Sequence, residues 1–228
     1  PEDRSRLDQT EVAQPAIFAL QMGLAALWRA WGIVPAAVIG HSIGEVAAAC
    51  TAGSLSSEQA ITLVYHRSRL MQRATGGGQM ASIELPAVDL AGRIAPYGER
   101  LSIAAINGPT TTVLSGERDA VQAVLAELVQ EQVSVRELRV NYAFHSAQME
   151  GLAAELVDAL ASFAPQRAAI PFYSTVTGAL IDGRQLDAAY WGRNMRQTVR
   201  FADALAGAAS ALVPGEGEAG RLVCLELS

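Results

Sequence analysis

The sequence has little of what several classes of protein depend on. Its two cysteines, Cys50 and Cys224, are too few for a disulfide framework or a structural metal site. Lysine is absent, so every cationic side chain apart from histidine is an arginine, and no basic cluster forms along the chain. Together with the net charge of −6, this predicts that the protein has no nucleic-acid partner.

Long apolar runs are also missing. No stretch is long enough to span a bilayer, and no signal peptide is apparent, so we expect a cytoplasmic protein without a membrane partner. Half of the 228 residues are nevertheless hydrophobic, which is enough for one substantial core or for a core with an inserted subdomain. The chain begins on a charged stretch and ends on an apolar run, 222–227, that is typical of a strand. We expect both ends to be truncated.

The most informative motif present is the G-x-S-x-G element at 40–44. An apolar run precedes it at 36–39, and a helix of small residues is predicted after it at 46–50. In this strand–turn–helix context, the motif predicts a sharp turn that exposes Ser42 as a nucleophile at the edge of a sheet. The backbone N–H of Ile43, at the start of the helix, is then placed to stabilise an oxyanion.

The order of predicted elements divides the chain into two parts. A long helix is predicted at about 11–31, before the turn, and a second helix begins with a capping box at 56–59 and runs to about 73. The segment 79–141 then shows the order β-α-β-β-α-β, which is typical of a ferredoxin-like unit. We therefore expect this segment to be inserted into a larger α/β domain.

A serine hydroxyl needs a base to become a nucleophile, and the chain has three histidines. His41 adjoins Ser42, with its side chain expected to point away, and His66 lies within a predicted helix in a structural or solvent-facing place. His145 follows a predicted strand and precedes a helix, so it is either the base or a surface histidine that caps that helix. No histidine follows it and no nearby carboxylate stands out, so we expect a Ser42–His145 dyad with the imidazole oriented by another group, such as a backbone carbonyl.

Arg67 is the second charged residue of interest. It lies in a predicted helix whose other face is apolar. If Arg67 is buried there, it needs an anionic partner, and the carboxylate of a substrate suits its two-pronged guanidinium. The alternative is an ordinary surface arginine of that helix.

Taken together, these features resemble the malonyl-type acyltransferase family, specifically the acyltransferase domains of modular type I polyketide synthases. The resemblance spans nearly the whole chain. The segments that carry it are 10–18, 40–45, 67–71, 107–109 with 115–116, 142–146, 171–178, and 190–191 with 193–194 and 199–201.

The resemblance implies an α/β fold with an α/β-hydrolase-like core and a parallel sheet. Residues 1–78 and 142–228 would form this large subdomain, and 79–141 the inserted ferredoxin-like subdomain. The family's early Gly-Gln-Gly motif and its late Gly-Pro-His segment are absent from this sequence. Both absences agree with the expected truncation.

The resemblance also implies roles for individual residues. Ser42 matches the nucleophile that holds the acyl group as an ester, and His145 matches the general base. Arg67 matches the arginine that pairs with the carboxylate of a malonyl-type unit. Asn194 matches the position whose backbone carbonyl orients the histidine, and Ile43 matches the residue whose N–H lines the oxyanion hole.

Four residues are expected around the acyl pocket: Gln14, Ile43, Tyr142 and Phe144. In the family, Phe at position 144 accompanies malonyl units, whereas Ser accompanies methylmalonyl units. Ile43 favours malonyl as well, but Tyr142 favours methylmalonyl, so the string Tyr142-Ala143-Phe144-His145 is a hybrid. On the strength of Phe144 and Ile43 we expect malonyl-CoA rather than methylmalonyl-CoA as the substrate. In a hydrophobic pocket a single methyl group changes binding by only about 1–3 kcal/mol.

The expected reaction is a ping-pong transfer in polyketide biosynthesis, from a CoA thioester to Ser42 and then to the phosphopantetheine thiol of an acyl carrier protein. We expect no bound cofactor and no metal, and a flanking ketosynthase domain in the full chain. Two alternatives remain open: a serine hydrolase, such as a thioesterase-like editing enzyme that uses the same Ser–His pair, and a non-catalytic docking module with a decayed site.

Overall fold

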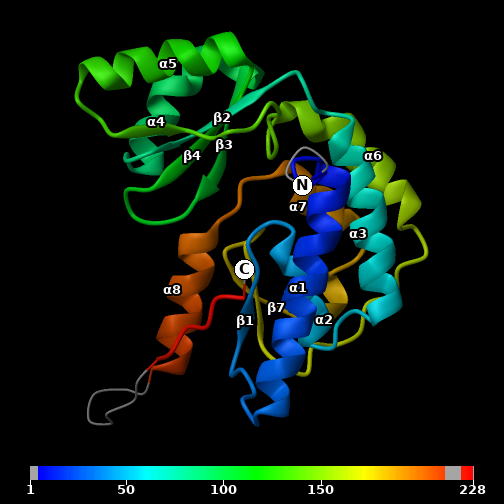
Figure 1. Ribbon diagram of the computed structural model, residues 1–228. Helices are drawn as coiled ribbons and strands as arrows, with labels where there is room; N and C mark the ends of the chain where they lie inside the picture. The colour runs from blue at the N-terminus through cyan, green and yellow to red at the C-terminus, as the bar shows by residue number, and fades with distance from the viewer. Residues whose placement is uncertain (1–4, 214–221, 228) are drawn as a thin grey trace.

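The computed structural model describes residues 5–213 and 222–227. Within them, two separate sheets organise the chain (Figure 1). The first sheet has the strand order β1 (Val38–Ile39), β6 (Phe172–Ser174) and β7 (Ala179–Ile181), in which β1 and β6 are parallel and β6 and β7 antiparallel. The fold class expected from the sequence, α/β, is confirmed.

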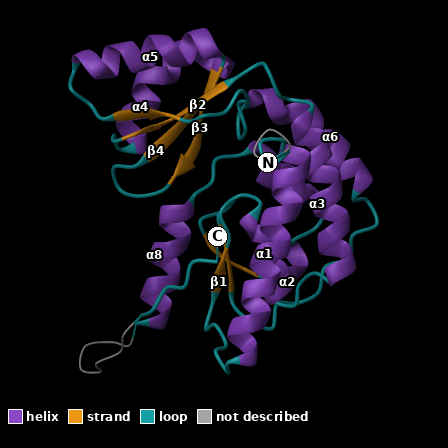
Figure 2. Ribbon diagram, in the orientation of Figure 1, coloured by secondary structure: helices purple, strands orange, loops and turns teal. Residues whose placement is uncertain are grey.

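Helices cover both faces of the first sheet. In Figure 2, α8 lies on one side of its strands and the remaining helices of this part lie on the other. Tyr173 of β6 packs with Ala204 and Ala208 of α8, while Phe172, its neighbour in the strand, enters the larger core on the opposite side. This alternation is the period-two pattern of a strand buried on both faces. The helices are α1 (Thr10–Ala30), α2 (Gly44–Thr51), α3 (Ser57–Gln72), α6 (Glu150–Ala159), α7 (Ala188–Arg196) and α8 (Phe201–Leu212).

The capping box predicted before α3 is present. The Ser56 side chain accepts a hydrogen bond from the Gln59 N–H, and the Gln59 side chain accepts one from the Ser56 N–H. These two bonds satisfy N–H groups that have no partner within the helix. The start of α3, and with it the position of Arg67 along the helix, is therefore fixed by local sequence.

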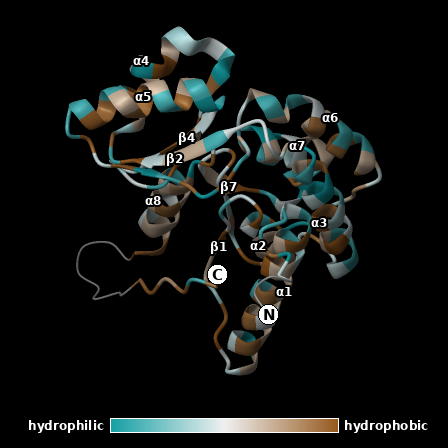
Figure 3. Ribbon diagram, turned by 45° about the horizontal axis from the view of Figure 1, so that its top comes forward, coloured by the Kyte–Doolittle hydropathy of each residue, from teal (hydrophilic) through white to brown (hydrophobic). Residues whose placement is uncertain are grey.

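The second sheet has the order β3 (Leu101–Ile106), β4 (Thr112–Gly116), β2 (Gln79–Ile83) and β5 (Val135–Glu137), and all of its pairs are antiparallel. Two helices, α4 (Ala87–Ile94) and α5 (Arg118–Gln130), pack on one face around a core that includes Leu90, Leu114 and Leu128. In Figure 3, hydrophobic and hydrophilic residues alternate along α5, as in an amphipathic helix. The expected element order β-α-β-β-α-β is present, while the subdomain boundaries at 79 and 141 stay predictions.

Short 3₁₀ turns occupy 95–100, 147–149 and 183–185. The prediction of a strand at 222–227 is wrong. These residues form no strand hydrogen bonds with the described part of the chain, and Val223 is 74% exposed. A strand exists only where a second backbone pairs with it, and no described backbone does so here. None of the described helices has the length and apolarity required to cross a membrane.

Candidate active site

Ser42 lies in the turn between β1 and α2. Its φ of 54° places it in the left-handed region, which a residue with a side chain rarely adopts. After Ser42 the chain turns back and passes close to residue 40. That position requires glycine, because a Cβ there would collide with the backbone of Gly44 and Glu45. The motif thus produces the strained strand–turn–helix geometry that presents the Ser42 side chain.

Ser42 and His145 come from distant parts of the chain and meet here. Ser42 Oγ lies 2.8 Å from His145 Nε2, and His145 Nδ1 lies 2.9 Å from the carbonyl oxygen of Gln197. A carbonyl oxygen can only accept, so Nδ1 holds the proton and the lone pair of Nε2 faces the serine hydroxyl. This tautomer allows Nε2 to accept the proton of Ser42.

The imidazole of His145 is held in its neutral form. Burial, aided by the nearby positive charge of Arg67, lowers the pKa of His145 from 6.5 to about 3, against a smaller opposing effect of the Gln197 hydrogen bond. The side chain is only 5% exposed. The imidazole of His145 is therefore unprotonated throughout the physiological pH range.

The expectation that the backbone carbonyl of Asn194 orients His145 is wrong. Gln197 supplies that carbonyl instead. The reason is geometric: Asn194 lies within α7, where carbonyl groups point along the helix axis, whereas Gln197 is the extended C-cap residue and its carbonyl points elsewhere. Asn194 is at the site, but its side chain makes the contacts, donating to the Ser42 carbonyl oxygen over 3.2 Å.

Arg67 is fully buried, which rules out the surface-arginine alternative. Its Nη2 donates to Ser42 Oγ over 2.9 Å, its Nη1 to Gln14 Oε1 over 2.7 Å, and its Nε to Asn194 Oδ1 over 3.3 Å. One further N–H on each terminal nitrogen has no acceptor among the described residues. Arg67 therefore has one N–H group on each terminal nitrogen available to a ligand beside the serine oxygen.

The guanidinium of Arg67 stays charged in this buried place. Burial lowers its pKa from 12.5 to about 10, and the negative charge of Glu45 opposes that shift. A buried cation with unused N–H groups is an anion-binding element, and a planar carboxylate matches its geometry.

Glu45 is the main residue of the site that sequence reasoning missed. It follows the serine motif directly, is fully buried, and accepts hydrogen bonds from Thr175, Tyr190 and Asn194. The available signal was a lone acidic residue at the start of an otherwise apolar helix, where a carboxylate needs donors if it faces the core. Burial raises the pKa of Glu45, and the donated hydrogen bonds oppose that shift.

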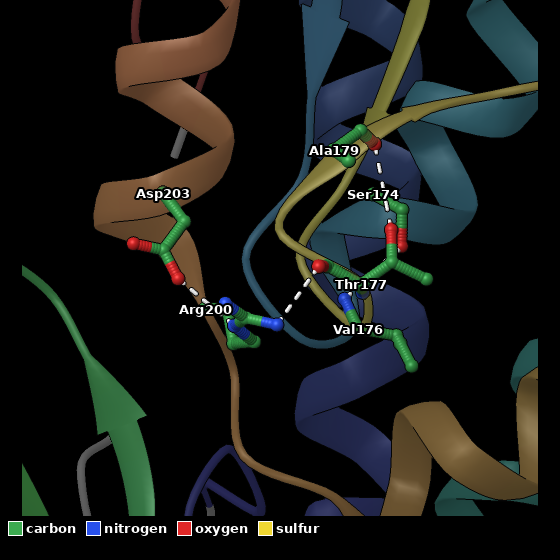
Figure 4. Close-up of polar contacts among 6 residues, drawn as sticks. All are labelled: Ser174, Val176, Thr177, Ala179, Arg200 and Asp203. Atoms are coloured by element: carbon green, nitrogen blue, oxygen red, sulfur yellow. Dashed lines mark hydrogen bonds and ion pairs between the residues drawn. The ribbon is translucent and has the colours of Figure 1, made fainter.

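The turn after β6 holds Thr175 in place beside Glu45. Ser174 Oγ accepts the N–H groups of Val176 and Thr177, each over 3.1 Å. Arg200, at the start of α8, donates to the Thr177 carbonyl oxygen and pairs with Asp203 over 2.8 Å (Figure 4). The segment opposite the serine turn is therefore fixed by its own polar contacts.

Ser42 and Arg67 open into a cavity of about 780 Å³. The four residues expected around the acyl pocket also line this cavity: Gln14, Ile43, Tyr142 and Phe144. The rings of Tyr142 and Phe144 are stacked, with centroids 3.7 Å apart and planes 11° apart. The N–H of Ile43 has no hydrogen-bond acceptor among the described residues and is available to an oxyanion.

Comparison with known proteins agrees with this geometry. The family model for the acyl transferase domain matches residues 1–215. The chain is 47% identical over 199 residues to erythronolide synthase EryA2 of Saccharopolyspora erythraea and 49% identical over 201 residues to the spectinabilin polyketide synthase system protein NorC of Streptomyces orinoci. These alignments cover 87% and 88% of this chain, but only 6% and 9% of the relatives.

Solved structures give the same picture. The acyltransferase domain from module 8 of the salinomycin polyketide synthase matches with a TM-score of 0.88 and 43% identity, over 90% of this chain and 48% of that one. The acyltransferase domain of the polyketide synthase PpsC of Mycobacterium tuberculosis matches with a TM-score of 0.83 and 36% identity, over 89% of this chain and 62% of that one.

The chain therefore belongs to the acyl transferase domain family, in the group formed by the acyltransferase domains of modular type I polyketide synthases. It spans less than a tenth of the curated relatives above and about half of the salinomycin structure. Acyl transfer in polyketide biosynthesis is the activity of this family.

Proposed function

We propose that the protein moves a malonyl-type acyl unit from CoA to the phosphopantetheine thiol of an acyl carrier protein, through an ester on Ser42. One observation supports this above all: a buried Arg67 donates to the oxygen of a serine that is also hydrogen-bonded to a neutral histidine. The serine and histidine suit acyl transfer, and the arginine suits an acyl group that ends in a carboxylate.

The reaction is proposed to occur in two matching halves. His145 Nε2 takes the proton of Ser42 as Oγ attacks the thioester carbonyl, and the resulting oxyanion is stabilised by the N–H of Ile43. The C–S bond breaks, and the imidazolium returns its proton to the leaving CoA sulfur. In the second half, His145 takes the proton of the carrier thiol, which attacks the ester and releases Ser42 with its proton restored.

Arg67 favours transfer of a carboxylated unit over transfer of a plain acyl group. A malonyl carboxylate would accept the two free N–H groups and place the thioester carbon next to Ser42 Oγ. The stacked Tyr142 and Phe144 would border the alpha-carbon, where Phe144 leaves less room for a methyl branch. We therefore propose malonyl-CoA in preference to methylmalonyl-CoA, with an acyl carrier protein and a flanking ketosynthase domain as partners.

Competitive loading tests the proposal. Purified protein is mixed with equal malonyl-CoA and methylmalonyl-CoA, and the mass of the acylated chain is read directly. We expect a predominantly malonyl adduct that is absent from Ser42→Ala and transfers to a carrier protein. A predominantly methylmalonyl adduct would overturn the extender preference. Rapid loss of the adduct to water, with no transfer, would indicate a hydrolase, and no adduct at all would indicate a docking module.

Replacing Arg67 tests the role of the carboxylate. Arg67→Ala is expected to lower malonyl loading about 100-fold, because a buried charge-assisted contact is lost, while loading of acetyl-CoA changes by less than about tenfold. The matched control is Arg69→Ala, which removes an exposed arginine from the same helix. Unchanged malonyl loading in Arg67→Ala would contradict the assignment.

A further inference from the structure

Glu45 is a buried ionisable group that the proposed steps leave without a role. It has no exposed surface, and its carboxylate collects donors from two segments of the chain, the turn after β6 and helix α7. The Thr175 N–H and O–H lie at Oε1, while the Tyr190 O–H and an Asn194 N–H lie at Oε2, at 2.7 Å and 2.9 Å. Burying a carboxylate is costly unless it is well hydrogen-bonded, and an apolar side chain of similar volume is often at least as stable, so stability alone does not account for this residue.

Asn194 links Glu45 to the reacting groups. Its two amide N–H groups are divided between Glu45 Oε2 and the Ser42 carbonyl oxygen, and its Oδ1 accepts from Arg67 Nε. The Glu45 carboxylate and the Ser42 carbonyl oxygen can only accept, so both require the NH₂ end of the Asn194 amide, and Glu45 lies at the shorter of the two distances. The other end, the oxygen, then faces Arg67.

Arg67 depends on this oxygen for its orientation. Gln14 and Ser42 hold the two terminal nitrogens, and Asn194 Oδ1 is the acceptor for Nε among the described residues. Together the three contacts fix the plane of the guanidinium, which decides where its unused N–H groups point. Arg67 and Glu45 form no direct ion pair among the described residues, so Asn194 is the structural connection between them.

We propose that Glu45 is a positioning residue that orients Arg67, through the side-chain amide of Asn194, to receive the carboxylate of the acyl unit. This inference rests on the proposed function, in which Arg67 binds that carboxylate. It predicts that the Glu45 side chain contributes to selectivity for carboxylated thioesters, although that side chain contacts neither the acyl unit nor Ser42 Oγ; only the Glu45 backbone N–H bonds to Ser42, at its carbonyl oxygen.

Glu45→Gln tests the link with a minimal change in shape. Its amide oxygen is expected to stay at the Thr175 N–H, since that backbone donor has no alternative acceptor among the described residues. The new NH₂ group then faces Tyr190, whose hydroxyl can accept, and Asn194, whose NH₂ cannot. The Asn194 amide is pushed out of place, and Arg67 loses the acceptor that holds its Nε.

Acylation rates of Ser42 are measured with malonyl-CoA and with acetyl-CoA, the latter over hours. We expect kcat/KM for malonyl-CoA to fall about tenfold in Glu45→Gln, mainly through KM, while the value for acetyl-CoA changes by less than about threefold. In an Arg67→Ala background, Glu45→Gln is expected to leave the malonyl-to-acetyl ratio unchanged. An equal loss for both substrates would overturn the inference.

Tyr190→Phe is the matched control. It removes a donor from the same oxygen of Glu45 but leaves the link through Asn194 intact, so we expect lower thermal stability with an unchanged malonyl-to-acetyl ratio. A fall of that ratio equal to that of Glu45→Gln would mean general loosening and would contradict the inference.

If Glu45→Gln does not fold, Asn194→Ala cuts the same link at its other end. The inference expects the malonyl-to-acetyl ratio to fall there too, and an unchanged ratio in folded Asn194→Ala would overturn it. If the wild-type chain forms no Ser42 adduct with any thioester, the proposed function itself has failed, which distinguishes that outcome from failure of the positioning role.

Discussion

At the residue scale, His145 links the chemistry of the site to the stability of the fold. Its pKa is about 3 in the folded chain and 6.5 ordinarily, so between these values the unfolded chain binds more protons. The free energy of unfolding should therefore fall as pH drops from 6.5 towards 3. We expect His145→Asn, whose amide can still donate to Gln197, to reduce that slope, by at most about 1.4 kcal/mol per pH unit.

Urea unfolding at several pH values between 4 and 7 measures the slope, in steps of about one unit. Burial raises the pKa of Glu45, so this residue acts with the opposite sign, but it is present in both proteins and its effect largely cancels in the comparison. The matched control is His66→Asn, the same change at a half-buried histidine outside the site. A slope change of equal size in both variants would contradict the prediction for His145.

Some residues of the site could be predicted from the sequence and others could not, depending on whether a side chain or only the folded backbone defines their role. Ser42 was predictable because its motif requires a specific turn, and His145 because few histidines compete for the role. The Gln197 carbonyl was not predictable, since any backbone has one and only the end of α7 decides which carbonyl faces the imidazole. Glu45 was missed because a carboxylate in a first helical turn is usually solvated there.

At the element scale, local pattern predicted where α1 runs but not which face it buries. The helix was expected at 11–31 and is observed at Thr10–Ala30. Its buried residues include Gln14 and Phe18, whereas the periodic apolar residue Leu20 is 55% exposed. Which face of a helix is buried depends on what packs against it, and α1 packs on α3. Gln14 is buried because its side-chain oxygen accepts a hydrogen bond from the buried Arg67 of α3.

Gly78, just before β2, lies against the segment that follows β5. A Cβ there would collide with the backbone of Tyr142 and Ala143, the segment that leads to His145. Gly78→Ala is expected to displace that segment, lowering the acylation rate about tenfold and the free energy of unfolding by about 1–3 kcal/mol. Loading kinetics and urea unfolding measure the two effects.

Gly92→Ala is the control for that prediction. Gly92 lies in α4 with no neighbouring atom in the way of a Cβ, so alanine should stabilise the helix by up to about 1 kcal/mol and leave acylation unchanged. Wild-type acylation in Gly78→Ala would show that the close contact does not control the position of His145.

At the scale of the whole molecule, the hydrogen-bonded pair of Ser42 and His145 is assembled across the two sheets. Ser42 leaves the sheet of β1, while His145 lies just after the chain has left the sheet of β5. Gln197 supplies the carbonyl oxygen that orients His145. Two residues further on, Val199 is hydrogen-bonded to Ala104 and Ile106 of β3. The distance between Ser42 and His145 therefore depends on how the two sheets are held together.

Asn107 provides a direct test of this dependence. In the loop between β3 and β4, its Oδ1 lies 2.9 Å from Nε2 of His41, the residue next to Ser42. Asn107→Ala breaks this contact at the surface, so we expect an acylation rate about three- to tenfold lower with a loss of only about 0.5–1.5 kcal/mol in the free energy of unfolding. Thr110→Ala, an exposed change in the same loop, should leave both quantities unchanged. If Asn107→Ala acylates Ser42 at the wild-type rate, the contact between His41 and Asn107 does not hold the dyad together, and the pairing of Val199 with β3 must suffice.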